Sequence, residues 1–268
     1  MRIGCCASIN EATSLKDAGF DYIEINAKQV LRAEEPDHIW NLDAPDVDKM
    51  PLPIEAANSL LPTNLAVVGQ YRDMQLLEQY MQRAVRRAAQ LGVKRLVFGS
   101  GVSRRRPEDV NTQTSEQQLI EFCRLAGDIC AEHDIIFAIE HLNHRETNML
   151  NRLQSVDALI NHLAHPRVAA AVDSYHFGIE NESDNALLKL GSRIQHVHLA
   201  EPVERREPGA HGQHARHAFD FQHFFALLHQ VGYTGRFSVE ARFSGPLAQV
   251  GPCTIELLKN AWRLAANT

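Results

Sequence analysis

The chain has 268 residues, 44% of them hydrophobic, which is enough to bury a full core, and barrels of this size commonly form one domain. A net charge of −6, and the lack of any apolar run near the roughly 20 residues that span a bilayer, argue against a nucleic-acid binder, a membrane-surface binder or a membrane protein. The amino terminus lacks the layout of a signal peptide and the five cysteines lack CxxC spacing, so we expect reduced thiols and a cytoplasmic location.

Apolar runs that are typical of strands alternate with amphipathic runs through the first half of the chain. The apolar runs predict strands over 2–7, 22–25, 53–57 and 95–98. Apolar residues at helical spacing predict helices over 10–18, 73–91 and 115–132. Residues 28–51, between the second and third strands, form a charged insertion that contains proline and that we expect to be partly helical.

The second half of the chain continues the same alternation. Strands are expected over 135–139, 168–172, 194–198 and 236–239, and helices over 156–163, 185–190, 221–231 and 254–265. Strands separated by helices imply parallel pairing through right-handed crossovers. About eight such units in a chain of this length predict an α/β fold, a (β/α)8 TIM barrel with residues 1–268 as a single domain. A doubly wound open sheet is the alternative, but no GxGxxG motif follows an early strand.

Ionisable side chains close four of the later strands, namely Glu140, Asp173, His198 and Glu240. Such groups cost solvation energy at the end of a buried strand unless they are paired or bind a cation. In a barrel the carboxyl ends of the strands converge, so the four side chains would share one centre. Three carboxylates and one imidazole suit one divalent ion, Mn²⁺, Mg²⁺ or Co²⁺, better than structural zinc, although zinc remains compatible. The alternative is a set of polar groups that hydrogen-bond to one another.

The segments around these strand ends resemble a known family. Residues 139–146, 172–176, 196–201 and 239–240 are similar to the xylose isomerase-like TIM barrels, a family of sugar phosphate isomerases and epimerases, and are most similar to its D-tagatose and D-psicose 3-epimerase branch. The resemblance implies that the four strand-end residues bind the metal and that Glu140 and Glu240 flank the reacting carbon as an acid/base pair. It also implies that substrate oxygens next to the carbonyl are held by Glu146, His176 and Arg205, with Arg206 as the alternative to Arg205.

The chemistry of such a site follows from general principles. A proton next to a carbonyl leaves only if the enediolate charge is stabilised, and a divalent cation chelated by the carbonyl and the adjacent hydroxyl does that. Carboxylates on opposite faces of the carbon allow epimerisation, whereas two transfers on one face give aldose–ketose isomerisation. We therefore expect an isomerase that acts on a small sugar or sugar-like molecule and does not bind nucleic acid or membranes. Assembly into a homo-oligomer stays open.

The same scaffold is also compatible with other enzyme functions. An inosose-type dehydratase or a hydroxypyruvate isomerase would use the same base and metal. An endonuclease IV-like phosphodiesterase would need further histidines at strands two and three, where this chain has Asn26 and Asn58. Binding of a neutral sugar without catalysis would leave the paired carboxylates without a purpose.

Several further residues carry weaker expectations. His196 is expected to be a hydrogen-bonded core histidine that supports the metal site. Glu24 and Glu55, together with Asn58, are expected either to bind distal hydroxyls or to pair with barrel arginines. Cys6 is expected to be a small buried hydrophobe, in a strand where the free-ketose epimerases of the family tend to carry an aromatic group.

Two basic segments and one histidine cluster could also bear on function. Arg104, Arg105 and Arg106 are expected to form a solvated loop, with a grip on a substrate phosphate or carboxylate as the alternative. Arg242 is expected to point inward, which would suit an acidic substrate. The cluster His211, His214 and His217 lacks fixed spacing on a regular element, so an exposed loop is favoured over a second metal site.

Overall fold

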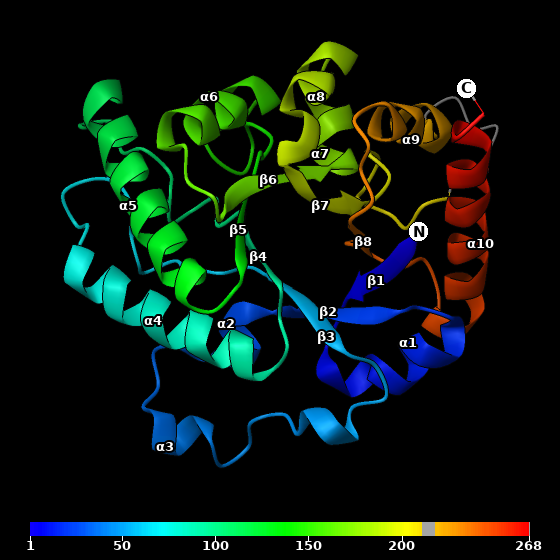
Figure 1. Cartoon of the computed structure of the whole chain (residues 1–268), viewed down its shortest axis with the longest axis horizontal. Coiled ribbons are helices and arrows are strands. Elements are labelled where there is room, and N and C mark those ends of the chain that lie inside the picture. The colour runs from blue at the N-terminus through cyan, green and yellow to red at the C-terminus, as the bar shows by residue number, and fades with distance from the viewer. Residues whose placement is uncertain (211–217, 268) are drawn as a thin grey trace.

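The computed structural model describes residues 1–210 and 218–267, and in it eight parallel strands close into one barrel (Figure 1). The strands pair in chain order and the last pairs with the first, which confirms the predicted (β/α)8 barrel and excludes the open sheet. The strands are β1 (Arg2–Cys6), β2 (Tyr22–Asn26), β3 (Ile54–Asn58), β4 (Arg95–Phe98), β5 (Ile136–Glu140), β6 (Val168–Asp173), β7 (Ile194–Leu199) and β8 (Arg236–Val239).

Helices surround the barrel in the order that the sequence predicts. They are α1 (Ala12–Ala18), α2 (Ala27–Leu31), α3 (Asp37–Trp40), α4 (Met74–Gln90), α5 (Thr112–Glu132), α6 (Leu153–Leu163), α7 (Ser174–Ile179), α8 (Asp184–Leu190), α9 (Phe221–Gln230) and α10 (Leu247–Ala265), with 3₁₀ turns at Ile9–Glu11, Val47–Lys49 and Gly191–Arg193. The 28–51 insertion is partly helical, as expected.

Two helices differ from the prediction. The short helix α7 was not expected, and it begins because Asp173 caps it: the carboxylate accepts the backbone N–H of Tyr175 at 2.9 Å. Helix α10 begins well before the expected 254 and runs through Pro252. No helix among the described residues is long and apolar enough to cross a membrane.

Side chains alternate along the strands between two separate interiors. The larger hydrophobic core lies between the strands and the helices and includes the stacked rings of Phe98 and Phe137, 5.4 Å apart. Inside the barrel, the apolar layer is small and consists of Val97, Ala138 and Ala171. The rest of the barrel interior is therefore open to polar side chains.

The ring of Tyr22 fills part of the barrel interior next to β1. Its hydroxyl donates to the carbonyl oxygen of Phe237 at 2.8 Å and lies 2.8 Å from the hydroxyl of Ser238. A Cβ atom at Gly4 would lie only 2.3 Å from the Tyr22 ring. Gly4 is therefore required by close approach rather than by its backbone angles.

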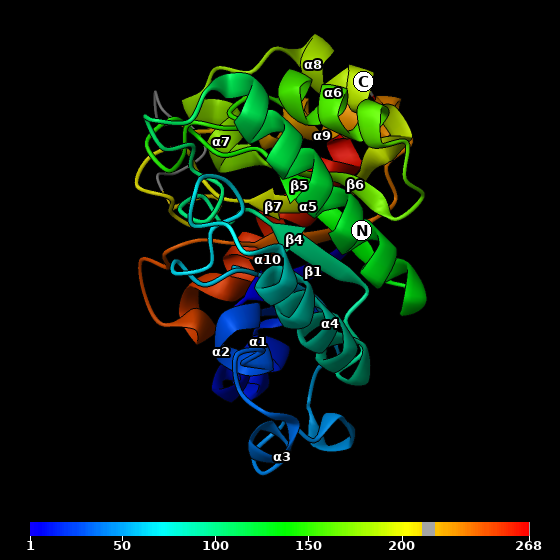
Figure 2. The same ribbon diagram turned by 90° about the vertical axis from the view of Figure 1, so that its left-hand side faces the viewer.

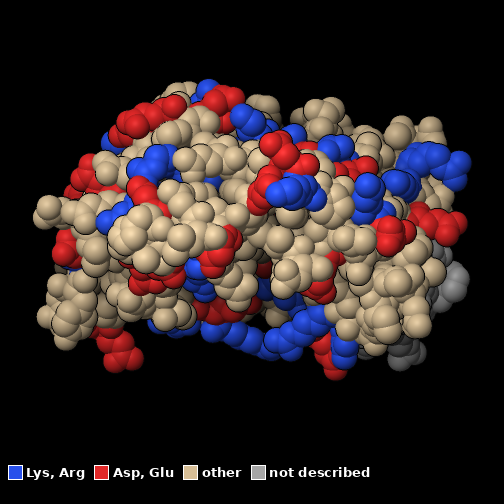
Figure 3. Space-filling view, turned by 90° about the horizontal axis from the view of Figure 1, so that it is seen from below, with Lys and Arg blue, Asp and Glu red and all other residues tan. Residues whose placement is uncertain are grey.

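Ion pairs close the amino-terminal end of the barrel. Glu55 accepts hydrogen bonds from Arg2, with the Nε atom at 3.0 Å, and from Arg236. Of the two roles expected for Glu55, the pairing with barrel arginines is the one that the structure shows. The longer connecting loops gather at the opposite end, on the left in Figure 2. On the face seen in Figure 3, acidic and basic side chains are interspersed.

Candidate active site

The four strand-end residues predicted to bind a metal come together at the carboxyl end of the barrel. Glu140, Asp173 and His198 lie in β5, β6 and β7, and Glu240 follows β8 directly. Each contributes one ligand atom to a group in which all atoms lie within 4.8 Å of one another. Convergence at this end follows from the parallel barrel, in which every strand points the same way.

His198 lies at the centre of this group and is completely buried. Its Nδ1 atom is 2.9 Å from a carboxylate oxygen of Glu140 and 2.9 Å from one of Glu240. Its Nε2 atom faces away and is 2.9 Å from Glu24. Burial opposes a charge on the ring, but Glu24, Glu240 and Glu140 together hold the pKa of His198 well above its ordinary value.

Arg205 supplies the positive charge that lies against these carboxylates. Its Nη2 atom is 2.9 Å from Asp173 and 2.7 Å from Glu240, and its guanidinium lies over the ring of Tyr175 with 4.7 Å between Cζ and the ring centre. Arg206 instead pairs with Glu204 at 3.1 Å. Arg205, rather than the alternative Arg206, therefore enters the site.

The Arg205 loop is held in place by backbone hydrogen bonds. The N–H of Arg242 donates to the carbonyl oxygen of Arg205 at 2.7 Å, and residues 206 and 242 form a parallel bridge. The side chain of Arg242 is exposed, so the expectation that it points inward was wrong. The reason is that the strand alternation stops after Val239, where β8 ends.

Two of the carboxyl groups have opposite pKa shifts. Burial raises the pKa of Asp173 to about 7, and the charges of Glu140 and Glu240 add to this while Arg205 opposes it. Burial also acts on Glu240, but Arg205 and His198 outweigh it and lower its pKa to about 2. Arg205 thus stabilises the ionised form of Glu240 enough to outweigh burial, but it does not do so for Asp173.

The donor set fits a divalent cation. Three acidic side chains share a small volume with one arginine and one imidazole, and burial together with the neighbouring carboxylates disfavours the ionised form of Asp173 by raising its pKa to about 7. Carboxylate oxygens with a single imidazole nitrogen are typical ligands of Mn²⁺, Mg²⁺ or Co²⁺. Glu140, Asp173, His198 and Glu240 are the residues that would hold it.

The residues expected to bind substrate lie beside this group. Glu146 is 39% exposed in its side chain, accepts from the amide of Asn143 at 2.9 Å and lies 3.8 Å from Arg205. His176 is buried, and its Nδ1 atom accepts the backbone N–H of Asn143 at 3.1 Å. The ring proton of His176 is therefore on Nε2, which has no hydrogen-bond partner among the described residues and lies 3.6 Å from Asp173.

A cavity of about 200 Å³ opens above the carboxylates. Glycines after β4 shape its wall, because a Cβ atom at Gly99 would lie 2.6 Å from the carboxylate of Glu140 and one at Gly101 would lie 2.7 Å from the carbonyl oxygen of Glu146. The lining residues are Lys28, Asn58, Ser59, Leu61, Thr63, Gly99, Ser100, Gly101, Val102, Ser103, Glu140, Leu142, Glu146, Arg205 and Glu240. The volume suits a molecule about the size of a monosaccharide.

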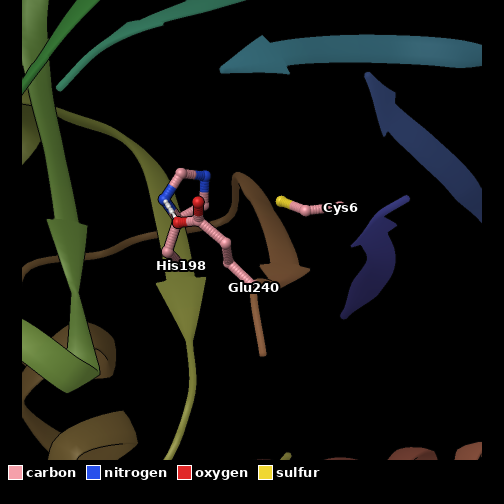
Figure 4. A group of neighbouring side chains, drawn as sticks. All are labelled: Cys6, His198 and Glu240. Carbon is pink, nitrogen blue, oxygen red and sulfur yellow. Dashed lines mark ion pairs between the residues drawn. The ribbon is translucent and has the colours of Figure 1, made fainter. Parts of the chain in front are cut away.

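Cys6 was expected to be a small buried hydrophobe, but it lies at the edge of the site and is not part of the hydrophobic core. Figure 4 shows its thiol pointing toward the pair formed by His198 and Glu240. The amide of Asn58 links the two sides: its nitrogen is 3.3 Å from the Cys6 sulfur and 3.0 Å from Glu240. Burial raises the pKa of the Cys6 thiol well above its ordinary value, which keeps it protonated.

A model of the xylose isomerase-like TIM barrel family matches residues 13–260 of the chain. The protein belongs to this family. An L-ribulose 3-epimerase of Methylomonas sp. (strain DH-1) is 26% identical to it over 251 residues, which cover 91% of this chain and 82% of the relative.

Two solved structures share the fold of this xylose isomerase-like barrel. A 3-keto-D-glucoside 4-epimerase from E. coli has a TM-score of 0.78 at 20% identity, covering 97% of this chain and 99% of the other. A D-allulose 3-epimerase from Methylomonas sp. has a TM-score of 0.78 at 21% identity, covering 97% and 98%. These relatives are epimerases, which belong to the isomerase class of enzymes.

Arg104, Arg105 and Arg106 were expected to form a solvated loop, but only part of this segment is exposed to solvent. Arg104 is completely buried, and its Nη1 atom donates to the carbonyl oxygen of Phe98 at 3.1 Å. Burial lowers its pKa to about 10. Arg105 is exposed and Arg106 donates to the carbonyl oxygen of Val110. None of the three lines the cavity described above. The predicted cluster of His211, His214 and His217 lies outside the described residues.

Sequence reasoning missed the part that Glu24 plays in the site. It was expected to bind distal hydroxyls or an arginine, but it is completely buried between His198 and His196, with 2.7 Å to the Nε2 atom of His196. The expectation of a hydrogen-bonded core histidine at 196 is confirmed. The period of two in β2, which places Tyr22, Glu24 and Asn26 on one face, is the signal that could have indicated the position of Glu24.

Proposed function

We propose that this protein is a divalent-metal-dependent sugar epimerase that acts on a ketose or a ketose-like molecule. The observation that carries the proposal is that Glu140 and Glu240, from separate walls of the barrel, both approach the Nδ1 atom of His198 to 2.9 Å and both line the same cavity. A substrate in the cavity would lie between two carboxylates, which is the arrangement that epimerisation requires.

The two carboxylates would have different tasks at the reacting carbon. One takes the proton from the carbon next to the carbonyl, and the other returns a proton to the opposite face. A divalent cation bound by Glu140, Asp173, His198 and Glu240 would supply electrostatic stabilisation of the negative charge that develops when the proton leaves. Arg205 and His198 lower the pKa of Glu240, so this carboxylate is ionised and ready to act as a base at neutral pH.

Three side chains are suited to orienting the substrate. His176 offers a buried N–H at Nε2, Arg205 offers N–H groups at the cavity wall, and Glu146 offers a partly exposed carboxylate oxygen. Donors and an acceptor placed together can fix the carbonyl and its two neighbouring hydroxyls, so that the proton to be removed faces a carboxylate. The far end of the cavity, with Lys28, Ser59 and Thr63, would hold the distal hydroxyls.

A panel of free ketoses with Mn²⁺, Mg²⁺ or Co²⁺, analysed by NMR in D₂O, tests the proposal. Epimerisation puts deuterium on the inverted carbon, whereas isomerisation gives an aldose and dehydration gives a product that absorbs in the ultraviolet. Deuterium incorporation that disappears in both Glu140→Gln and Glu240→Gln supports the proposal. Full metal binding and full turnover in the double variant would contradict it.

A further inference from the structure

A carboxylate is buried inside the barrel beneath the proposed metal site. Glu24 in β2 has no exposed surface. Burial of an ionised carboxylate costs roughly several kcal/mol unless the group is well paired. Among the described residues, its side-chain partners are the two histidines of β7: one oxygen is 2.9 Å from the Nε2 atom of His198, and the other is 2.7 Å from the Nε2 atom of His196.

This pairing determines which way the ring of His198 faces. An ionised carboxylate only accepts hydrogen bonds, so the Nε2 atom of His198 carries a proton that it donates to Glu24. The Nδ1 atom is then directed at the opposite side, where Glu140 and Glu240 each lie 2.9 Å away. Rotation of the ring about its χ2 angle would break the bond to Glu24 and leave one of its two carboxylate oxygens without its hydrogen-bond donor.

His196 in turn holds Glu24 in place. Its ring is perpendicular to that of His198, with an angle of 88° and 4.9 Å between the ring centres, and both rings are fully buried. One carboxylate thus bridges two imidazoles at adjacent inward positions of the same strand. A bidentate arrangement of this kind fixes the orientation of Glu24 more strictly than a single hydrogen bond would.

We propose that Glu24 is a positioning residue that fixes the His198 ring so that its Nδ1 atom is directed at the group formed by Glu140, Asp173 and Glu240. This proposal rests on the proposed function, since it assigns His198 Nδ1 as the nitrogen ligand of the divalent cation. Glu24 is not among the described residues that line the substrate cavity, so its influence on the site passes through the ring of His198, to which it is bonded.

Metal affinity is the first measurement. Isothermal titration of the purified full chain with Mn²⁺ should show about 10- to 100-fold weaker binding in Glu24→Gln than in the wild type. Glu55→Gln is the matched control, because it makes the same change in a carboxylate that is also buried in the barrel but lies at the opposite end. Equal Mn²⁺ affinity in the wild type and in a folded Glu24→Gln variant would overturn the proposal.

A second measurement does not need the metal. In the metal-free wild type with ¹⁵N-labelled histidine, the Nε2 protons of His196 and His198 should give downfield NMR signals typical of hydrogen bonds to a carboxylate. Both signals should move upfield or exchange with water in Glu24→Gln and persist in Glu55→Gln. If His198 carries no Nε2 proton in the wild type, or if its signal is unchanged in the variant, the proposal is wrong.

The two measurements also separate this proposal from the proposed function. A wild type that binds none of the three divalent ions contradicts the proposed function, and the NMR signals then decide whether Glu24 orients His198. Should Glu24→Gln fail to fold, Glu24→Asp serves instead, because its carboxylate is one methylene shorter and cannot reach both rings. In that variant the same losses of Mn²⁺ affinity and of the His198 signal are expected.

Discussion

At the amino-terminal end of the barrel, Glu55 lies against two arginines, whereas at the carboxyl end three acidic side chains share one. In the first arrangement, two positive charges surround one carboxylate, so the ionised form of Glu55 is fully compensated. The second leaves an excess of negative charge in a small volume, which destabilises the folded chain unless a cation enters. One fold can thus use buried carboxylates for stability at one end and reserve them for chemistry at the other.

The largest expected difference between the two ends is in catalysis. Glu140→Gln and Glu240→Gln should each lower kcat by about 10²- to 10⁴-fold, because each removes a group that transfers a proton. Glu55→Gln should keep kcat within about threefold of the wild type, since Glu55 does not line the cavity and is bonded to Arg2 and Arg236 at the opposite end of the barrel. Steady-state kinetics on the best ketose of the panel measures both, and a comparable loss in Glu55→Gln would contradict the assignment of catalysis to the carboxyl end.

Binding of the cation should stabilise the protein only if the carboxylates at the carboxyl end of the barrel are intact. Mn²⁺ at about 100 times its Kd should raise the free energy of unfolding by about 2.7 kcal/mol, and a chelator should reverse this. Thermal unfolding followed by circular dichroism measures the effect. The increase should persist in Glu55→Gln and vanish in a variant with both Glu140→Gln and Glu240→Gln; an increase that survives in the latter variant would place the cation elsewhere.

Single substitutions in the metal-free protein should change stability in opposite directions at the two ends. Glu55→Gln should lower the free energy of unfolding by about 1–3 kcal/mol, because Arg2 and Arg236 lose a charged acceptor. Asp173→Asn should raise it by about 0.5–2 kcal/mol, because it relieves the crowding of carboxylates and its amide oxygen can still cap α7. Urea unfolding in the presence of a chelator measures both, and the same sign for both variants would contradict the comparison.

A smaller effect is expected from pH at the amino-terminal end. Burial opposes the charge of Glu55, but Arg2 and Arg236 hold its pKa below the ordinary value of 4.5. Its contribution to stability is therefore fully present above pH 4.5 and is lost as the pH falls through the lower pKa of the folded state. Urea unfolding between pH 3 and pH 7 should show a shallower loss of stability in Glu55→Gln than in the wild type. Parallel curves would mean that Glu55 is not ionised in the folded chain.

The smallest effect is expected at Arg242, which the sequence placed near the substrate. Its side chain is exposed, and only its backbone holds the Arg205 loop. Arg242→Ala should change stability by less than about 0.5 kcal/mol and leave KM unchanged. A large rise in KM measured with an acidic ketose would show that this side chain reaches the substrate.

The barrel and the position of four residues at its carboxyl end could be predicted from the sequence alone. Alternating periods fix which runs are strands, and parallel strands must end together, so Glu140, Asp173, His198 and Glu240 could be placed at one centre without coordinates. The resemblance to the family added Glu146, His176 and Arg205. In the structure, Glu146 and Arg205 line the cavity, and the Nε2 atom of His176 lies 3.6 Å from Asp173.

The pairing of the remaining buried charges depends on the three-dimensional arrangement of the strands and could not be predicted from the sequence. Glu24 and Glu55 look alike in the sequence, as acidic residues inside early strands, yet one bonds to two histidines of β7 and the other to arginines of β1 and β8. The partners of a side chain inside a barrel come from strands far away in the chain, and their height along the barrel depends on the register of every strand between them. Loops follow no period at all, which is why the burial of Arg104 and the exposure of Arg242 could not be predicted.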